Sequence, residues 1–395
     1  MTDTAGKPVG PGSRAGAFAT GDGLIRRRRR RRLRYSALGA AAVLVVAGGA
    51  GWAAYAKLSS NITADEAAAA ELARYERERP TALVRGALNL LLIGSDTRAG
   101  DGNRKYGKDI VGQRSDTTIL LHLAADRESA TAVSIPRDLM VDVPSCLQED
   151  GRRSDPVFAM FNHAFQVGGS ACTIRTVEKL TGIRIDHHMV VDFSGFKEMV
   201  DAVDGVEVCL KEPVDDKAAK LRLPAGRVTL DGEQALGYVR ARKSLGNGSD
   251  TERMGRQQRF LGALVNKVQS TDVLLNPVKL YPLLDAATSA LTTDPELASL
   301  RGLYQLVRGL RDIPTERVRF LTVPRESYVY DANRDQLVEP EAEKLFDRLR
   351  ADRSVVVIPE DSQKVPGEDT GSGGQDGPSP APTFRGYTAS EHTCE

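Results

Sequence analysis

The sequence lacks the short motifs of the commonest nucleotide, zinc and serine-hydrolase sites. Its 395 residues contain no P-loop, GxGxxG fingerprint, HExxH pair, CxxC pair or GxSxG elbow. It has only 4 cysteines, too few for a small disulfide-scaffolded protein. Its formal net charge of +1 argues against a globular nucleic-acid-binding surface, which needs an excess of basic residues on one face.

The small net charge is the sum of three unequal parts. Residues 1–34 carry ten basic side chains, including the unbroken run from Arg26 to Arg32, and two acidic ones, so their net charge is +8. The residues after Pro359 have a net charge of −5, which leaves −2 for the middle of the chain. The basic charge is therefore concentrated at one end.

An uncharged segment of 22 residues, from Tyr35 to Ala56, follows the arginine run. A helix of this length spans about 33 Å, enough for the hydrocarbon core of a bilayer. The positive-inside rule places its arginine-rich side in the cytoplasm and everything after Lys57 outside. We therefore predict a disordered cytoplasmic tail over 1–34 and a transmembrane signal-anchor helix over 35–56.

Two other interpretations of this end compete with the anchor. A cleaved signal peptide usually has a shorter apolar region of about 7–15 residues, and no clear small-x-small cleavage site follows here. An arginine-rich arm for nucleic acid would explain the run but not the apolar segment. The length and the flanking charges favour the anchor.

Residues 57–84 are predicted to form a stalk helix and linker. Thr63 and Glu66 have the spacing of a capping box, and Pro80 ends the helical pattern. The segment has few large apolar residues, so we expect a spacer with little packed surface.

Short apolar runs in 85–360 alternate with helical patterns. The strand patterns lie at 88–94, 117–123, 131–136, 189–193, 206–210, 318–323 and 354–358, and the helical patterns at 172–182, 193–205 and about 252–313. This alternation predicts an α/β fold: a single extracytoplasmic α-β-α domain with a central mixed sheet flanked by helices. Residues 361–395 are acidic and rich in Gly, Ser and Pro, so a disordered tail is predicted.

Cysteines outside the membrane can form disulfides. Cys146 and Cys172 flank a polar loop and are the first choice for a bridge, although all four cysteines could also be unpaired. Cys209 lies at the end of a strand pattern and is expected to be buried and free.

Three charged patches directly adjoin buried-strand patterns. Asp96 and Arg98 follow the first strand, Arg114 and Asp116 precede the second, and Arg137 follows the third. Ligands of α/β sheets bind at strand ends, so Asp96 and Asp116 are candidates to share one edge. Two carboxylates, with waters and phosphates, are the usual ligands of Mg²⁺. For any single aspartate, turn formation is the competing interpretation.

The most distinctive patch is the basic stretch 236–261. Its basic residues include Arg240, Arg242, Lys243, Arg253 and Arg256, against the acids Asp250 and Glu252. Arg253, Arg256, Gln257 and Phe260 have the spacing of one helix face. With Asp250 as a candidate cap, the second half forms a helix whose basic face becomes apolar at Phe260, so that face points inward. Buried arginines need an anionic partner, and a pyrophosphate is suitable. The competing interpretation is an ordinary solvated helix face.

The sequence resembles the LytR-CpsA-Psr family of cell-wall glycopolymer transferases over about Asn89–Lys267. The resemblance rests on NLLLIGSDTR, RSDTTILLHL, SIPRDLMVDVP, NHAFQVGG, TGIRIDHHMVVDFSGF, LDGEQALGYVRAR and SDTERMGRQQRFL, in that order. It implies a phosphotransferase that attaches a polyprenyl-pyrophosphate-linked glycan, such as a teichoic acid, to a hydroxyl of peptidoglycan and releases polyprenyl phosphate. It also implies an apolar tunnel for the lipid and Mg²⁺ on the pyrophosphate, with Mn²⁺ as the alternative ion.

The resemblance also assigns roles to residues of this sequence. Asp96 and Asp116 match the carboxylates that organise the metal. The residues that match the family's pyrophosphate contacts are Arg114, Arg137, Arg240, Arg242, Arg253 and Gln257, and those that match orienting positions are Asp250 and Arg98. Arg137, Asp116 and Arg114 are the catalytic candidates, with Asp116 as the first candidate for the base. A basic residue often precedes Asn162 in the family; here Arg152 or Arg153 is the candidate substitute.

Three other functions remain open from the sequence. A pyrophosphohydrolase would use the same site with water as acceptor. A membrane-bound transcriptional attenuator would need the basic tail to bind nucleic acid, which the predicted topology argues against for the folded domain. A non-catalytic wall-binding module would not need Arg137 or Asp116.

Overall fold

The computed structural model describes residues 21–95, 115–217, 219–241, 250–269, 277–359 and 382–391, and the side chains of these except 21–33, 250–251 and 277–280. Contacts divide the chain into two compact units, Met1–Lys57 and Leu58–Glu395. Each unit is described by itself below.

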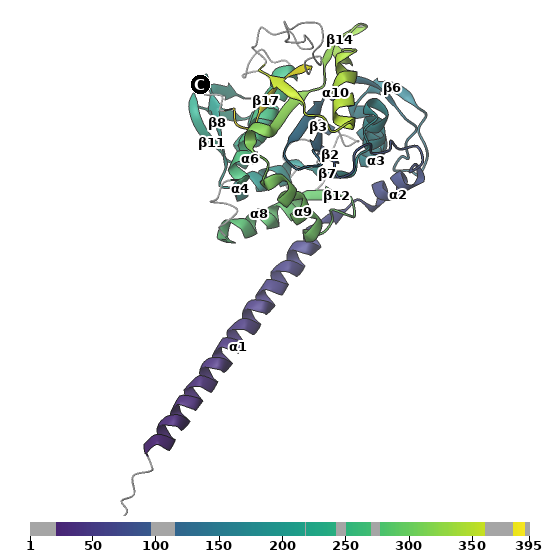
Figure 1. Cartoon of the computed structure of the whole chain (residues 1–395). Coiled ribbons are helices and arrows are strands. Elements are labelled where there is room, and N and C mark those ends of the chain that lie inside the picture. Colours follow the sequence, from purple (N-terminus) through teal and green to yellow (C-terminus); the bar gives the residue numbers. More distant parts are fainter. Residues whose placement is uncertain are drawn as a thin grey trace, which may run out of the picture. The chain divides into compact units, whose positions relative to one another are not determined.

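The first unit consists mainly of helix α1, Gly21–Asn61 (Figure 1). The last four residues of α1 lie beyond Lys57, where this unit ends. The part from Arg34 to Asn61 is long and apolar enough to cross a membrane, and the predicted span 35–56 lies within it. The backbone of 21–34 is helical, so the prediction of disorder for this part is wrong. Arginine has a high helix propensity, which lets the run continue the helix.

The second unit is built on a mixed nine-stranded sheet with the order β1-β12-β7-β2-β3-β4-β13-β17-β16. Its strands are β1 (Thr63–Ala64), β2 (Leu88–Ser95), β3 (Ser115–Leu123), β4 (Ala130–Ile135), β7 (His187–Val191), β12 (Leu291–Thr293), β13 (Val318–Thr322), β16 (Val356–Ile358) and β17 (Thr383–Thr388). β2, β3 and β4 are antiparallel, while β7 and β13 join them in parallel. Six of the seven predicted strands belong to this sheet.

Helices cover both faces of the sheet (Figure 1). They are α3 (Asn162–Thr181) and α10 (Glu341–Arg350) on one face, and α6 (Asp250–Gln269) and α9 (Leu300–Arg311) on the other. Successive residues of a strand point to opposite faces. In β3, Leu120 packs in the cluster with α3 and α10, and Ile119 packs in the cluster with α6 and α9. The α/β fold with flanking helices is thus confirmed.

The predicted helical stretch 252–313 is interrupted. It contains α6, then α8 (Pro277–Ala290), the short strand β12 and α9. The strand predicted at 206–210 forms β8 (Val206–Leu210), but it pairs with β11 (Gly226–Leu230) outside the central sheet. This antiparallel strand pair packs with α4 (Phe193–Ala202) and α5 (Gly232–Arg240) in a separate apolar cluster. Three hairpins also lie outside the central sheet: β5 (Met140–Val143) with β6 (Val157–Met160), β9 (Val214–Asp216) with β10 (Leu221–Leu223), and β14 (Arg325–Tyr328) with β15 (Asp331–Leu337).

The segment predicted as a stalk is part of the packed domain. Thr63 and Ala64 form β1, and Asp65 caps helix α2 (Glu66–Arg74) by accepting a hydrogen bond from the amide of Ala68 at 3.0 Å. Ala68 and Leu72 are buried in the main core. The predicted cap at Thr63 and the idea of an unpacked spacer are therefore wrong, because alanine side chains allow a close approach to α3.

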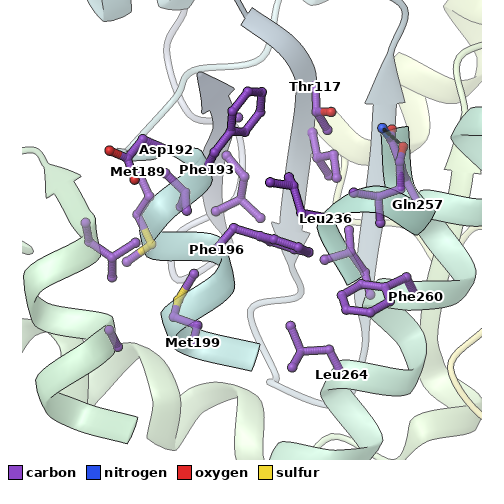
Figure 2. Close-up of a pocket in the computed structure, with 18 of the residues that line it drawn as sticks. Thr117, Met189, Asp192, Phe193, Phe196, Met199, Leu236, Gln257, Phe260 and Leu264 are labelled. Atoms are coloured by element: carbon purple, nitrogen blue, oxygen red, sulfur yellow. Dashed lines mark hydrogen bonds between the residues drawn. The ribbon is translucent and has the colours of Figure 1, made fainter. Parts of the chain in front are cut away.

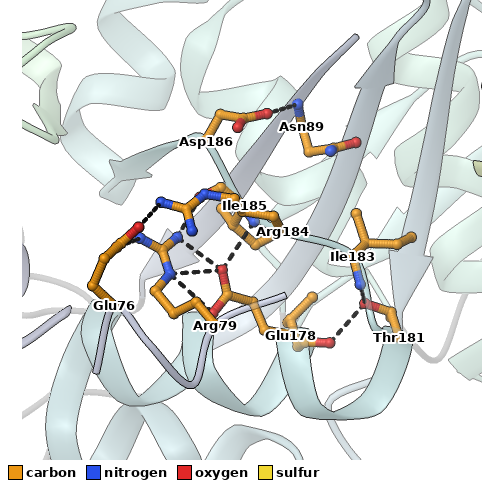
Figure 3. Close-up of polar contacts among 10 residues, drawn as sticks. Glu76, Arg79, Asn89, Glu178, Thr181, Ile183, Arg184, Ile185 and Asp186 are labelled. Carbon is orange, nitrogen blue, oxygen red and sulfur yellow. Dashed lines mark hydrogen bonds and ion pairs between the residues drawn. The ribbon is translucent and has the colours of Figure 1, made fainter. Parts of the chain in front are cut away.

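A buried ion pair ties the chain after α2 to α3 (Figure 3). The guanidinium of Arg79 donates to Glu178 of α3 at 2.8 Å, and these side chains are only 10% and 4% exposed. The same carboxylate accepts from the amide of Ile185 at 3.0 Å, and Arg79 also donates to the Ile185 carbonyl oxygen. Removing either charge would leave the other buried without its partner, which usually costs several kcal/mol.

The tail predicted to be disordered contains a strand of the sheet. β17 lies between β13 and β16, with Phe384 and Tyr387 buried. At Gly386 an added Cβ would lie 2.3 Å from the carbonyl oxygen of Phe320, so only glycine fits this close strand contact. The acidic, Gly-rich composition of 361–395 as a whole predicts disorder, although these six residues form a strand.

Cys146 and Cys172 form a disulfide, as predicted, with Cα atoms 5.5 Å apart. It joins the loop after β5 to α3, which is kinked at Gly168 and Gly169. An added Cβ at Gly168 would lie 2.8 Å from the carbonyl oxygen of Leu147, so the kink depends on glycine. Cys209 is also disulfide-bonded, so the prediction that it is free is wrong.

We expect the Cys146→Ala/Cys172→Ala variant to lose about 3 kcal/mol of unfolding free energy, because the bridge closes a loop of 26 residues in the unfolded chain. Denaturant unfolding of the full chain in detergent, without reductant, measures the difference. The exposed pair Arg317–Glu128 gives a control, since Arg317→Gln should change the same quantity by less than about 1 kcal/mol. Equal stability of the double variant and the wild type would contradict the prediction.

Candidate active site

A cavity of about 1,300 Å³ lies in the second unit between the sheet and its helices (Figure 2). Its walls come from β2, β3 and β7 on one side and from α4, α5, α6, α8 and α9 on the other. Most of the lining is apolar, including Ile119, Met189, Phe196, Leu236, Phe260 and Leu264. Such a space suits a long hydrocarbon chain.

The cavity changes from polar to apolar along α6. Arg253 and Gln257 line it first, followed by Phe260, Leu261 and Leu264. At 1.5 Å per residue, Arg253 and Leu264 are about 16 Å apart along the helix. In Figure 2, Thr117 and Gln257 lie toward one end and Leu264 toward the other. Arg308 and Arg311 of α9 add basic side chains elsewhere in the lining.

Asp116 lines the polar end and forms an ion pair with Arg137, whose Nη1 donates to Asp116 Oδ1 at 2.8 Å. Arg137 Nε also donates to Asp138 Oδ2 at 3.2 Å. The contact follows from topology: β3 begins where the antiparallel β4 ends, with Thr118 opposite Ile135. The Asp116 and Arg137 side chains are 36% and 22% exposed, so the pair adds less than about 1 kcal/mol to stability. Its main consequence is to orient the guanidinium.

Arg240 is the last residue of α5 and lies over the ring of Phe193, with its Cζ 4.6 Å from the ring centroid. α5 starts with a capping box formed by Asp231 and Gln234. A basic side chain in the last turn complements the helix dipole, and the ring face restricts the guanidinium without neutralising it. Arg240 can therefore present its N–H groups to an anion in the cavity.

Arg253 and Gln257 come from successive turns of α6. Arg253 is 6% exposed, and Gln257 Nε2 donates to the Val239 carbonyl oxygen at 3.2 Å, which joins α6 to α5. Arg256, which is predicted to face the anion together with Arg253, does not line the cavity and donates instead to the Ala241 carbonyl oxygen, so this part of the prediction is wrong. Burial lowers the pKa of the Arg256 guanidinium.

The structure thus brings together the described part of the predicted site. Asp116, Arg240, Arg253 and Gln257 line one cavity, and Arg137 contacts Asp116. The predicted residues Asp96, Arg98, Arg114 and Arg242 lie outside the described residues, as does the side chain of Asp250, whose backbone begins α6. Arg152 and Arg153 are not substitutes for a phosphate contact: they pair with Asp150 and Glu71 and do not line the cavity.

Sequence reasoning missed several residues at the polar end. Ser95 and Thr117 line the cavity, Phe193 supports Arg240, and Asp138 holds Arg137. Ser95 and Asp138 stand beside predicted site residues, so adjacency was an available signal. Nothing in the sequence pairs Phe193 with Arg240, because the two come from different helices.

A Mg²⁺ ion bound with phosphates is compatible with this end of the cavity. In the described part of the chain no group of three or more His, Cys, Asp or Glu side chains could hold a metal alone. Mg²⁺ usually takes only one or two carboxylates together with waters and substrate phosphates. The partly exposed Asp116 offers such a carboxylate, and Asp96 directly follows Ser95 in the chain.

Residues 58–351 match the model of the LytR_cpsA_psr family. The chain belongs to this family. The match confirms the resemblance seen in the sequence, and the family region covers both the cavity and the Asp116–Arg137 pair.

The chain is similar to proteins that are named for cell-wall biosynthesis or teichoic acid transfer. The chain is 38% identical over 271 residues to the "Probable cell wall biosynthesis protein LcpB" of Corynebacterium glutamicum, covering 66% of this chain and 61% of that protein. It covers only 50% of a second relative from that organism, LcpA. It is 30% identical to the "Polyisoprenyl-teichoic acid--peptidoglycan teichoic acid transferase TagT" of Bacillus subtilis, covering 76% of this chain and 89% of that protein.

Solved structures share the fold. The "LytR-Csp2A-Psr enzyme from Actinomyces oris" superposes with a TM-score of 0.54 at 21% identity, covering 69% of this chain and 93% of that one. "TagT bound to LI-WTA" superposes with a TM-score of 0.52 at 24% identity, covering 70% and 97%. At these identities the likeness concerns the fold alone.

The wall of the cavity formed by α9 is attached to β7 through Asp294. Its Oδ1 contacts His187 Nδ1 at 3.1 Å, and its Oδ2 accepts from the His188 amide at 3.2 Å. Burial tends to lower the pKa of His187, but Asp294 raises it above the ordinary 6.5. Burial tends to raise the pKa of Asp294, but His187 lowers it below the ordinary 3.8.

These shifts predict a pH dependence of stability. The His187 contribution is complete below pH 6.5 and is lost as the pH rises through the raised pKa, whereas the Asp294 contribution is lost only below pH 3.8. Between pH 6 and 8 the melting temperature of the wild type should fall by roughly 2 °C more than that of Asp294→Asn. Asp312→Asn, at an exposed position, is the control and should keep the wild-type difference. The same pH dependence in Asp294→Asn would refute the assignment.

Proposed function

We propose that this protein is a phosphotransferase that attaches a polyprenyl-pyrophosphate-linked glycopolymer to peptidoglycan and releases polyprenyl phosphate. The observation that carries the proposal is the apolar cavity that ends in Asp116, Arg240 and Arg253, with Arg137 held against Asp116. An apolar chain joined to an anionic head matches both parts of this space. The name of the TagT relative, a polyisoprenyl-teichoic acid--peptidoglycan teichoic acid transferase, supports the same assignment.

We assign the arginines to the pyrophosphate. Guanidinium groups bind phosphate oxygens through paired N–H donors, and those of Arg240 and Arg253 approach the polar end from two different helices. Burial of Arg253 strengthens its interaction with an anion, since the local dielectric is low. Arg137 is kept in place by Asp116 and Asp138, so it needs little rearrangement to stabilise charge that develops during transfer.

The proposed chemistry is a displacement at the phosphorus that carries the glycan. The acceptor hydroxyl oxygen forms the new bond to this phosphorus, the bond to the bridging oxygen breaks, and polyprenyl phosphate leaves. A carboxylate takes the hydroxyl proton. Asp116 is our candidate, because Arg137 engages Oδ1 and orients the carboxylate toward the polar end. Most of the acceleration in such a reaction comes from positioning and charge stabilisation.

We also propose a Mg²⁺ requirement. Asp116, with Asp96, would hold the ion at the pyrophosphate, where it would neutralise charge on the phosphate oxygens. The support is the chemistry of the donor set: a partly exposed carboxylate beside a basic pocket.

We propose that α1 anchors the protein with its N-terminus in the cytoplasm and the second unit outside. The run from Arg26 to Arg32 precedes the apolar part of α1, as the positive-inside rule requires. The disulfide Cys146–Cys172 in the second unit supports an oxidising location beyond the membrane.

The proposal predicts transfer that depends on Arg137. The full chain in detergent, given lipid-linked glycan, Mg²⁺ and peptidoglycan, should form a glycan–peptidoglycan phosphodiester, measured as label in the insoluble fraction. Arg137→Lys keeps the charge but loses the guanidinium fork, and it should lower kcat about 100-fold. Arg317→Gln, at an exposed pair, is the control.

Two results would contradict this assignment. If the wild type forms only free phosphorylated glycan whether or not peptidoglycan is present, the protein is a hydrolase with water as acceptor. If Arg137→Lys transfers glycan at the wild-type rate, Arg137 has no part in the chemistry.

The metal assignment predicts that chelation by EDTA stops transfer and that added Mg²⁺ restores it. Asp116→Asn should raise the Mg²⁺ concentration for half-maximal rate about ten-fold or more, because the amide is a weaker ligand. Asp126→Asn changes an exposed turn carboxylate and should leave this concentration unchanged. Undiminished transfer in EDTA would rule out the ion.

A further inference from the structure

An exposed apolar patch lies on two hairpins of the second unit. We call it the aromatic platform and define it by Val157 and Phe158 of β6, Tyr328 of β14, and Val329 and Tyr330 of the following turn. Phe158 is 52% exposed, Val329 71% and Tyr330 85%. Exposed apolar side chains gathered in one place usually mark a binding surface.

The rings of the platform contact one another across the two hairpins. The ring centroids of Phe158 and Tyr328 are 6.1 Å apart, and those of Tyr328 and Tyr330 are 5.3 Å apart. The three rings therefore form a continuous row. Aromatic pairs at these separations support each other, so the row is preformed for a ligand.

Both hairpins are hydrogen-bonded to the segment that carries Arg137. After β6, the amides of Phe161 and Asn162 donate to the carbonyl oxygens of Leu139 and Arg137 at 2.8 and 3.0 Å. From β15, the amide of Asp335 donates to the Asp138 carbonyl oxygen at 3.1 Å. Phe158 comes only four residues before Asn162, so their Cα atoms are at most about 14 Å apart. The platform is thus held at a fixed, short distance from the Asp116–Arg137 pair.

The platform is separate from the apolar cavity. None of its five residues lines the cavity, whose lining already suits the hydrocarbon chain. The hairpin 325–337 carries two arginines and three acids, a net charge of −1, which disfavours an anionic polymer chain. Of the reactants in the proposed function, the peptidoglycan acceptor is the one to which no binding surface has yet been assigned.

We propose that the aromatic platform binds the glycan strand of the peptidoglycan acceptor and directs its hydroxyl to the Asp116–Arg137 pair. The sugar rings of such a strand have flat C–H faces that pack on aromatic rings. The tyrosine hydroxyls can form hydrogen bonds with the sugar hydroxyls at the edges of these rings. The inference rests on the proposed function for the identity of the acceptor.

The test uses the full chain in detergent and purified insoluble peptidoglycan sacculi as the probe. Phe158→Ala/Tyr330→Ala should bind sacculi about ten-fold more weakly in cosedimentation. In the transfer assay its KM for peptidoglycan should rise about ten-fold, with KM for the donor and kcat unchanged. Tyr330→Trp should bind like the wild type, since it keeps an aromatic face. Tyr281→Ala removes an exposed tyrosine elsewhere on the domain and is the control.

Unchanged sacculus binding and unchanged acceptor KM in the double variant would overturn the proposal, whatever else the platform binds. An unchanged donor KM shows that the variant is folded, so loss of acceptor binding is then specific. Failure of the proposed function has a different signature: the wild type makes no phosphodiester product, while sacculus binding still depends on Phe158 and Tyr330. If the wild type forms the phosphodiester but sacculus binding does not depend on Phe158 and Tyr330, the proposed function stands and only the role of the platform is refuted.

Discussion

The antiparallel pairing of β3 with β2 and β4 is the constraint on which the rest of the second unit depends. It places Ser115 opposite Ser95 and Thr118 opposite Ile135, so the start of β3 lies beside the ends of both neighbours. Arg137, two residues beyond β4, can then reach Asp116 at 2.8 Å. A one-residue change of register would move Ile119 and Leu120 to the wrong layers, so burial on both faces keeps the site in place.

The Asp116–Arg137 pair lies where two different surfaces meet. Asp116 lines the apolar cavity, and the segment 137–139 holds the hairpins of the aromatic platform. In the function that we propose, the donor occupies the cavity and the acceptor approaches over the platform. A partly exposed ion pair contributes little to stability, so its value here is positional. Holding both reactants relative to one guanidinium is the kind of orientation that accelerates phosphoryl transfer.

The strand predictions rest on strong local sequence patterns and are correct, whereas the predictions of a spacer and of a disordered tail rest on composition and are wrong for residues that the structure describes. The apolar strands of the central sheet are continuous runs, because helices cover both faces, and they were correctly predicted. The bridge Cys146–Cys172 was also correctly chosen. Composition is the weaker guide: the alanine-rich segment predicts a spacer although Leu72 is buried, and the acidic tail predicts disorder although it contains β17. Cys209 was wrongly expected to be free.

The apolar N-terminal helix, the α/β class, the family and the residue types of the site can all be predicted from the amino-acid sequence, because each depends on a local run or motif. The three-dimensional fold is needed to bring Asp116, Arg240 and Arg253 to one cavity. It also places Phe193 under Arg240, and Phe158 beside Tyr328 on one platform. These residues are far apart along the chain and belong to different strands and helices. Their proximity is a consequence of strand register and helix packing, which no local pattern encodes.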